Sequence, residues 1–229
     1  MPTLNASKWG YVVSSNFSTH AAARGQSTGN SVVVGPSSGT AEAVRYRRFS
    51  AKGGSTFYAV QRAFYYFDTS GITGTVTAAT LNVQGALSAD SNTIIVPSTA
   101  FSGDGSTNLA TSDLGNVAFN TTYAAGFTGW ATSGNISMAL RSTALSDIQN
   151  NNAFICAILQ FDNDFSDSEL TSNDDLGNGI NYGTTAYLDY TVAGAGPSDV
   201  TSLSGIAKAD ITSVNSIAIA DITSINTVS

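Results

Sequence analysis

The densest group of metal-ligand side chains in this 229-residue chain is an acidic stretch in its last third. Asp162, Asp164, Asp167 and Glu169 follow one another closely, and 173–175 adds an asparagine and two aspartates. Calcium takes about six to eight oxygen ligands, which carboxylates and amides supply. The four acids are therefore a candidate calcium site, although the stretch has no internal glycine and is not an EF-hand loop. The alternative is a solvated acidic turn between two strands.

Arg62 and Asp68 flank an aromatic segment at even spacing, so both side chains can face one side of a strand. One interpretation is a ligand-binding pair. We favour a structural one, in which the two residues fix loops at one end of the fold through charge-assisted hydrogen bonds. Charged groups near a core persist only when they are paired.

A basic segment contains Arg45, Arg47, Arg48 and Lys52, which together with Arg62 are five of the nine basic residues. Strand alternation places Arg45 and Arg47 on one face and Arg48 on the other. In a chain of net charge −7 such a patch can dock an acidic neighbour. The alternative is an edge strand protected by charge. The patch is too small, and the chain too acidic, to indicate a nucleic-acid partner.

Aromatic residues between 120 and 134 are candidates for a glycan platform, because sugar rings stack on flat aromatic faces. The candidates are Tyr123, Phe127 and Trp130, which lie among glycines and threonines. Trp9 and Tyr182 also lie near glycine-rich segments. The competing interpretation is that these rings belong to the core, where large aromatic side chains are usually found.

Nucleophilic and acid–base catalysis lack their usual residues. The only histidine, His20, lies in a polar segment without a nearby acid, and the only cysteine, Cys156, lies in the most apolar segment, where a thiol is inert. The only glutamates are Glu42 and Glu169, and no aspartate is marked as a glycosidase acid. A single cysteine also excludes an internal disulfide or a cysteine metal cluster. We predict no enzymatic activity and no cofactor other than calcium.

Composition predicts a folded β protein. Only 11% of residues are charged, yet 42% are hydrophobic and 10% aromatic, and serine and threonine make up 58 of the 229 residues. No apolar run reaches the roughly 18 residues of a membrane span. The first residues lack the apolar stretch of a secretory signal, so we expect synthesis and assembly in a cytoplasm.

Short apolar segments separated by turn-forming residues predict an all-β fold, a jelly-roll β-sandwich. Segment 154–161 is apolar on both faces, as a central strand would be, and 143–149 predicts a short helix. The predicted strands are 11–13, 31–34, 44–49, 57–67, 75–83, 93–96, 116–119, 136–140, 154–161 and 186–192.

Four regions follow from these patterns. Residues 1–55 form an N-terminal arm with the first strands, 56–192 the jelly roll, 193–198 a flexible linker, and 199–229 a repetitive β tail. In the tail, 206–216 and 217–227 are identical at eight of eleven positions. An 11-residue period can produce a right-handed helical coil, but isoleucine, valine, threonine and asparagine are mediocre helix formers.

The tail cannot shelter its apolar side chains alone, so we predict that it oligomerises or docks. A trimer is our estimate, because narrow β stems often close around three copies. The alternative is a flexible tail that contains a recent duplication. The residues predicted to be buried between copies are Ile206, Ile211, Val214, Ile217, Ile219, Ile222, Ile225 and Val228.

The middle of the chain resembles a known family. Its elements are an arginine before an aromatic strand with Phe-Asp-Thr-Ser (62–72), an Ala-x-Leu strand (79–83), Trp130 with 136–140, the segment 154–162 and a closing Tyr-Leu-x-Tyr strand (186–192). This pattern resembles the carbohydrate-binding-module-like jelly-roll domains of the DNRLRE type, found in bacterial surface proteins and in structural proteins of tailed bacteriophages. It covers about residues 57–192, and the tail looks like C-terminal repeats common in phage proteins.

The resemblance implies non-catalytic assembly or adhesion and carries over no catalytic residue. We expect a virion structural protein, either a capsid decoration, a head fibre or a tail appendage, that binds itself and other virion proteins. The alternative is an adhesin of a phage tail or bacterial surface that binds host glycan. A polysaccharide-degrading enzyme is the least favoured hypothesis.

Overall fold

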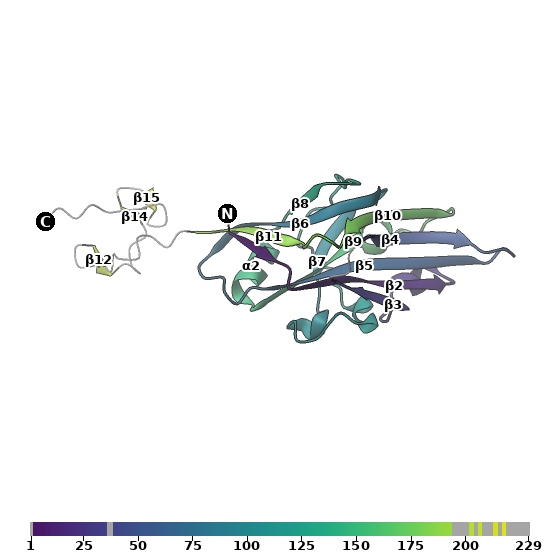
Figure 1. Ribbon diagram of the computed structural model, residues 1–229, viewed down its shortest axis with the longest axis horizontal. Helices are drawn as coiled ribbons and strands as arrows, with labels where there is room; N and C mark the ends of the chain where they lie inside the picture. Colours follow the sequence, from purple (N-terminus) through teal and green to yellow (C-terminus); the bar gives the residue numbers. More distant parts are fainter. Residues whose placement is uncertain are drawn as a thin grey trace.

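The computed structural model describes residues 2–35 and 39–193, together with the backbone of 202–203, 206–207, 213–214 and 217–218. We call the part between residues 2 and 193 the body. It is mostly β (Figure 1). Its strands are β1 (Thr3–Asn5), β2 (Lys8–Phe17), β3 (Ser31–Val34), β4 (Thr40–Ser50), β5 (Thr56–Asp68), β6 (Val76–Ala89), β7 (Thr93–Pro97), β8 (Asn135–Ala139), β9 (Ala153–Gln160), β10 (Asp174–Asn181) and β11 (Tyr187–Val192).

All eleven strands belong to one antiparallel sheet that branches twice. The main path runs β1–β11–β6–β10–β4–β5–β2–β3. One edge of β5 pairs first with β4 and then with β9, which carries β7. Similarly, β6 pairs with β11 and β10 along its length and with β8. The prediction of a β-rich fold is therefore confirmed.

Nine of the ten predicted strands match a strand of the structure, segment 116–119 does not, and strands β1 and β10 were not predicted. Segment 116–119 forms only an isolated bridge between Ser98 and Val117. Strand β10 was missed because it is built from aspartate, glycine and asparagine, which are depleted in strands. Gly179 is required there, because a side chain would collide with the carbonyl oxygen of Ala86 on β6.

The core has two parts, which lie on opposite faces of β5 and β9. Ala63, Tyr65 and Phe67 of β5 face a cluster that includes side chains of β6, β8 and β11. Val60 and Phe64 face a second cluster under the loops that follow β7. Residues 154–159 of β9 are all buried, as predicted for a central strand.

Short helices cover parts of the sheet. They are α1 (His20–Arg24), α2 (Ser142–Asn150), the 3-10 turns η1 (Phe101–Gly103) and η2 (Thr111–Gly115), and the π-helical turn η3 (Phe161–Phe165). The predicted helix 143–149 is α2, which buries Ala144 and Ile148 one turn apart. No helix in the described residues is long and apolar enough to cross a membrane.

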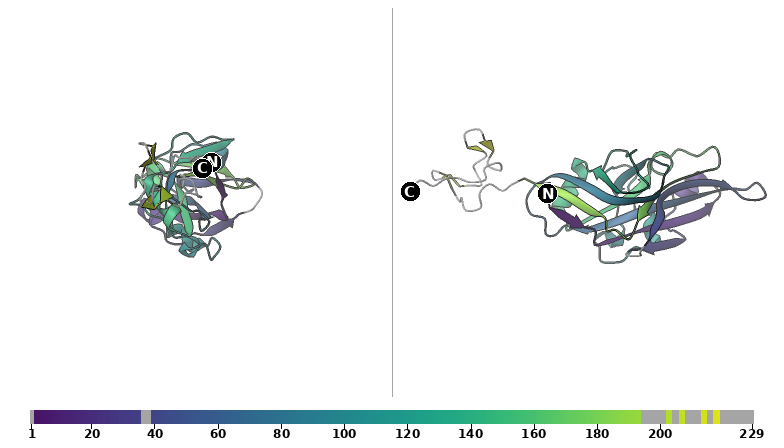
Figure 2. Two further views of the ribbon diagram at one scale, coloured as in Figure 1. Left: turned by 90° about the vertical axis from the view of Figure 1, so that its left-hand side faces the viewer. Right: turned by 45° about the horizontal axis from the view of Figure 1, so that its top comes forward.

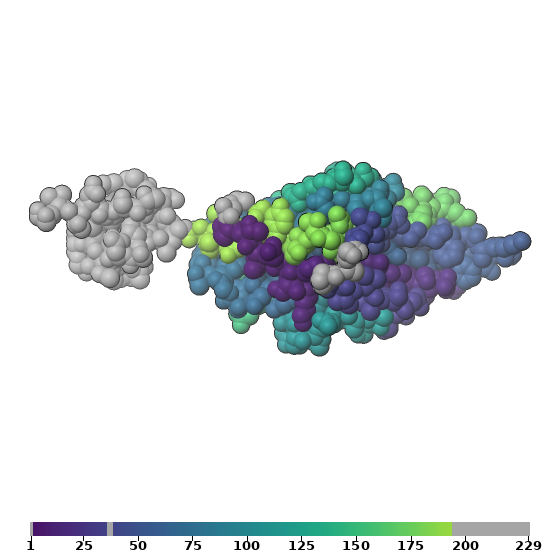
Figure 3. Space-filling model, viewed as in Figure 1, coloured from purple at the N-terminus to yellow at the C-terminus, as the bar shows by residue number. Residues whose placement is uncertain are grey.

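The N-terminal region is part of the body and not a separate arm. Strands β2 and β4 both pair with β5, so the sheet has no break at residue 55. The N-terminus, β11 and α2 lie at one end of the body (Figures 1 and 2). The β4–β5 hairpin projects at the other end, and Figure 3 shows its tip in blue.

The described residues of the tail form two hairpins with the same register. β12 (Ser202–Leu203) pairs with β13 (Ile206–Ala207), and β14 (Ser213–Val214) pairs with β15 (Ile217–Ala218). Equivalent strands are 11 residues apart, so the sequence period is also a structural period. Of the predicted linker 193–198 only Ala193 is described, and the burial predicted for the tail isoleucines lies outside the described residues.

Candidate functional site

The most enclosed charged pair in the described part of the chain is Arg62 with Asp164. Both side chains have 0% exposure. Nε of Arg62 donates to Oδ2 of Asp164 at 2.8 Å and Nη2 donates to Oδ1 at 2.6 Å. Nη1 of Arg62 also donates to the carbonyl oxygen of Leu114 at 2.7 Å, and Nη2 donates to that of Arg24 at 2.8 Å. Arg62 therefore joins β5 to three separate segments. Its hydrogen bonds and its counter-charge offset the free-energy cost of burying the guanidinium.

The geometry agrees with a structural role for Arg62. The predicted partner, Asp68, was wrong. Asp68 is exposed and accepts hydrogen bonds from Oγ of Ser70 at 2.6 Å and from its backbone N–H at 3.1 Å. These bonds lower the pKa of Asp68, with the hydroxyl contributing most. Asp68 closes a local turn and does not reach Arg62.

The acidic stretch does not form the predicted calcium site. Asp164 pairs with Arg62, and the other three acids each meet a partner from a different part of the chain. The partners are Asn92 for Asp162, His20 for Asp167 and Tyr58 for Glu169. In residues 2–35 and 39–193, no three His, Cys, Asp or Glu side chains are placed to hold a metal ion.

A local cap explains why these acids diverge. Oε1 of Gln160, at the end of β9, accepts the backbone N–H groups of Asn163 at 2.6 Å and Asp164 at 3.2 Å. This turns the chain into η3 directly after the strand, so Asp162 and Asp164 leave the backbone in different directions. One carboxylate becomes buried while its neighbour stays half-buried.

The predicted glycan platform is not an exposed surface. Tyr123 and Trp130 are buried, and only Phe127 is partly exposed. The indole N–H of Trp130 donates to the carbonyl oxygen of Gly179 at 3.1 Å. Trp9 and Tyr182 are buried as well. The prediction of an aromatic platform was therefore wrong, because these rings belong to the hydrophobic core or pack against it.

Tyr123 instead forms a wall of a polar cavity of about 490 Å³. Its hydroxyl donates to Asp147 of α2, and burial, reinforced by this hydrogen bond, raises the pKa of Tyr123. The rest of the lining is mostly polar and includes no basic side chain. It consists of Ser98, Gly103, Asp104, Asn150, Asn151, Asn152, Ala153 and Ile155. Of this lining, the sequence analysis named only Tyr123; the run of three asparagines that starts at the last residue of α2 was a further signal.

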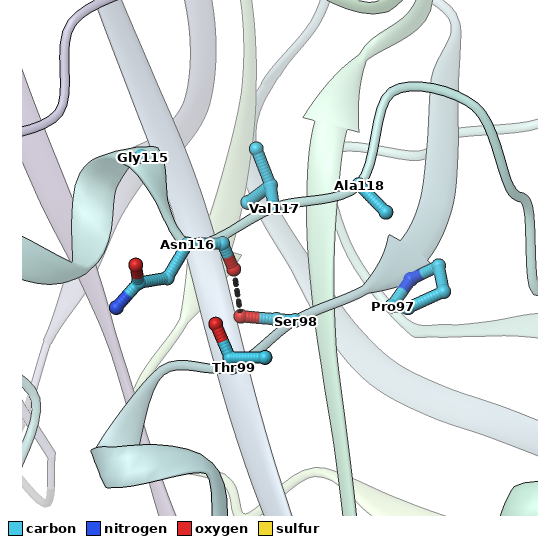
Figure 4. Close-up of a pocket in the computed structure, with 7 residues that line it drawn as sticks. All are labelled: Pro97, Ser98, Thr99, Gly115, Asn116, Val117 and Ala118. Carbon is cyan, nitrogen blue, oxygen red and sulfur yellow. Dashed lines mark hydrogen bonds between the residues drawn. The ribbon is translucent and has the colours of Figure 1, made fainter.

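A second groove, of about 240 Å³, is lined by Pro97, Ser98 and Thr99 and by residues 115–118 (Figure 4). Two backbone hydrogen bonds hold its sides together, from Thr99 to Asn116 at 3.1 Å and from Ala118 to Pro97 at 3.0 Å. The hydroxyl of Ser98 also donates to the Asn116 carbonyl oxygen at 2.5 Å. No lining side chain is charged, so the groove offers no ionised acid or base.

His20 has an acidic neighbour that the sequence did not reveal. Its Nε2 lies 3.0 Å from Oδ1 of Asp167, and its Nδ1 contacts the hydroxyl of Tyr46. An Asp–His–hydroxyl arrangement is a catalytic pattern, but Tyr46 has no exposed surface and burial raises its pKa. Burial likewise raises the pKa of the Cys156 thiol. Neither group is accessible to a substrate.

The basic segment follows the predicted alternation. Arg45 and Arg47 both reach Asp175 of β10, and Arg48 lies on the other face, 3.3 Å from the hydroxyl of Tyr58. The hydrogen bond with Asp175 raises the pKa of Arg45. Strand β4 pairs with β5 and β10, so the protected-edge alternative was wrong.

The chain was compared with protein-family models and with curated proteins. No family model matches it, and no curated protein matches it.

Proposed function

We propose that this chain is a non-enzymatic structural protein of a tailed-bacteriophage virion, a capsid decoration, head fibre or tail appendage. Its copies assemble into a homo-oligomer through residues 199–229, and the body contacts other virion proteins. We further propose that the body is a jelly roll. The packing of β5 and β9 against β6, β8 and β11 supports this fold, because it resembles the two layers of a sandwich.

The observation that carries the proposal is the pair of tail hairpins. Each has two-residue strands, and β14–β15 repeats β12–β13 after 11 residues. An isolated two-stranded hairpin is marginally stable at best, and these hairpins belong to separate two-stranded sheets. Repeating units of this kind gain stability from neighbours that share a core. Other copies of the same tail are the simplest source of such neighbours.

Light scattering coupled to size-exclusion chromatography tests the proposal on the full chain. We expect a trimer for the native protein and a monomer after Val214→Asp combined with Ile217→Asp, because two charges per copy would be buried between tails. The matched control is Thr132→Asp with Ser133→Asp, which adds the same charge at exposed positions of the body. A monomeric native chain, or a tail variant that stays trimeric, contradicts the proposal.

The polar cavity favours a second candidate function, binding of a host glycan. Its carboxylates, amides and Tyr123 can exchange hydrogen bonds with sugar hydroxyls, and the lining has no cation to attract an acidic ligand. Asn152→Leu should abolish binding on a glycan array, while Thr132→Leu should not. An array that the native chain does not bind contradicts this function.

A further inference from the structure

Strand β3 ends the main path of the sheet and pairs only with β2 among the described strands. Its sequence is Ser-Val-Val-Val, without charge or proline. Val34 is 37% exposed and is one of two large hydrophobic residues exposed in the described part. Natural edge strands are usually protected by charge, proline, a bulge or a covering segment, because an open edge pairs with other chains.

The edge of β7 shows what such protection looks like in this protein. The segment 117–127 runs along β7, and its N–H groups donate to carbonyl oxygens of Thr93, Ile95 and Pro97. A proline also ends that strand. In the described residues, β3 has none of these devices.

Hydrogen bonds hold both ends of β3 against β2. Before the strand, the Asn30 N–H donates to the Val13 carbonyl oxygen at 2.7 Å, and Oδ1 of Asn30 accepts the Ser15 N–H at 2.7 Å. After it, the Gly35 N–H donates to the Trp9 carbonyl oxygen at 2.8 Å. A strand fixed at both ends loses little conformational entropy when another strand joins it.

The register of β3 on β2 fixes which backbone groups are free. Because Gly35 donates to Trp9, alternation also turns the N–H and C=O of Val33 toward β2. The N–H and C=O of Val32 and Val34 then point outward. Two antiparallel copies centred on Val33 would place Val32 opposite Val34 in both directions, which allows four backbone hydrogen bonds.

We propose that β3 pairs edge to edge with β3 of a second copy of this chain around a two-fold axis. This inference rests on the proposed assembly of the chain into homo-oligomers. A copy is the occupant that fits, because the contact is self-complementary and joins valine to valine across the strands. The chain carries a net charge of −7, so copies repel in general, and β3 offers an uncharged strip where they can meet.

The symmetry gives the contact a specific role. A two-fold contact cannot lie within a three-fold oligomer, so it would connect copies from neighbouring tail-linked trimers. Four residues per copy bury too little surface for a stable dimer in dilute solution. The contact would therefore operate where copies are crowded, as they are on a particle surface.

Cysteine crosslinking of the full chain tests the register. In the proposed pairing Val33 faces its own copy at a Cα separation of about 4.5 Å, which suits a disulfide. Ser31 on the same strand would lie about 13 Å from its own copy. Under mild oxidation we expect Val33→Cys to form a disulfide-linked dimer severalfold faster than Ser31→Cys. Cys156 is buried and does not interfere.

A second change separates pairing from folding. Val34→Pro removes an outward N–H that β2 does not use, so the body should keep its thermal midpoint while the crosslinking of Val33→Cys is lost. Val34→Thr keeps the N–H and should retain crosslinking. Equal rates for Val33→Cys and Ser31→Cys, or crosslinking unaffected by Val34→Pro, overturn the β3 contact.

These outcomes are independent of the tail experiment. If Val33→Cys crosslinks selectively while native and tail-variant proteins have the same mass, the β3 contact is supported and the tail oligomer fails. If the tail variant becomes monomeric while Val33→Cys does not crosslink selectively, only the β3 contact is overturned.

Discussion

Two arginine–aspartate pairs of this protein have the same chemistry in opposite surroundings. In both, Nε and Nη2 of the arginine donate to the two oxygens of one carboxylate. Arg62 and Asp164 have 0% exposure, whereas Arg45 and Asp175 are 22% and 41% exposed. Water screens the surface pair, while the interior pair depends entirely on its partners. Geometry alone therefore does not predict what a pair contributes to stability.

The largest effect is expected from removing one half of the buried pair. Asp164→Ala leaves the Arg62 cation without a counter-charge, which should lower the free energy of unfolding by about 3–5 kcal/mol. Denaturant titration measures this loss. Asp162→Ala, two residues away and half-buried, is the matched control and should change stability much less. A similar small effect for both variants would show that solvent reaches Arg62.

An intermediate effect is expected from removing the whole pair. Arg62→Met combined with Asp164→Leu replaces both charges by apolar groups of similar size, which often restores stability. The carbonyl oxygens of Arg24 and Leu114 then lose their donor. Each unpaired oxygen lowers the free energy of unfolding by about 1–3 kcal/mol when it is fully buried. We expect the double variant to be more stable than Asp164→Ala in the same titration. A double variant less stable than Asp164→Ala would mean that the carbonyl bonds outweigh the ion pair.

The smallest effect is expected at the surface pair. Asp175→Ala should cost about 0–1 kcal/mol, because Arg45 remains 3.2 Å from Glu42 and is screened by water. Unfolding measured at low salt and at about 1 M salt should show that most of the difference disappears at high salt. A large loss of stability that does not depend on salt would mean that Asp175, like Asp164, is shielded from water.

The sequence predicted the elements that depend on local patterns. Strand β9 was predicted from an apolar run and α2 from a short helical segment. Strand β10 was missed because its position between β4 and β6 depends on a close backbone approach at Gly179 and not on propensity. Nothing local marks it as an interior strand.

The candidate sites depended more on contacts between distant residues. Asp164 is 102 residues from Arg62, so spacing pointed to the nearer Asp68. The glycine-rich surroundings of Trp130 suggested exposure, yet its ring is buried. In contrast, the tail period was visible in sequence and reappears as hairpin register, because a repeated sequence repeats its local structure.

The four hydrogen bonds of Arg62 also constrain how the chain is made. The acceptors lie at residues 24, 114 and 164, so the set is complete only after nearly the whole body has been synthesised. A nascent chain that ends before Asp164 holds a cation in its central strand with no counter-ion. Such fragments should remain unfolded on the ribosome, and the body should reach its native form in one late step.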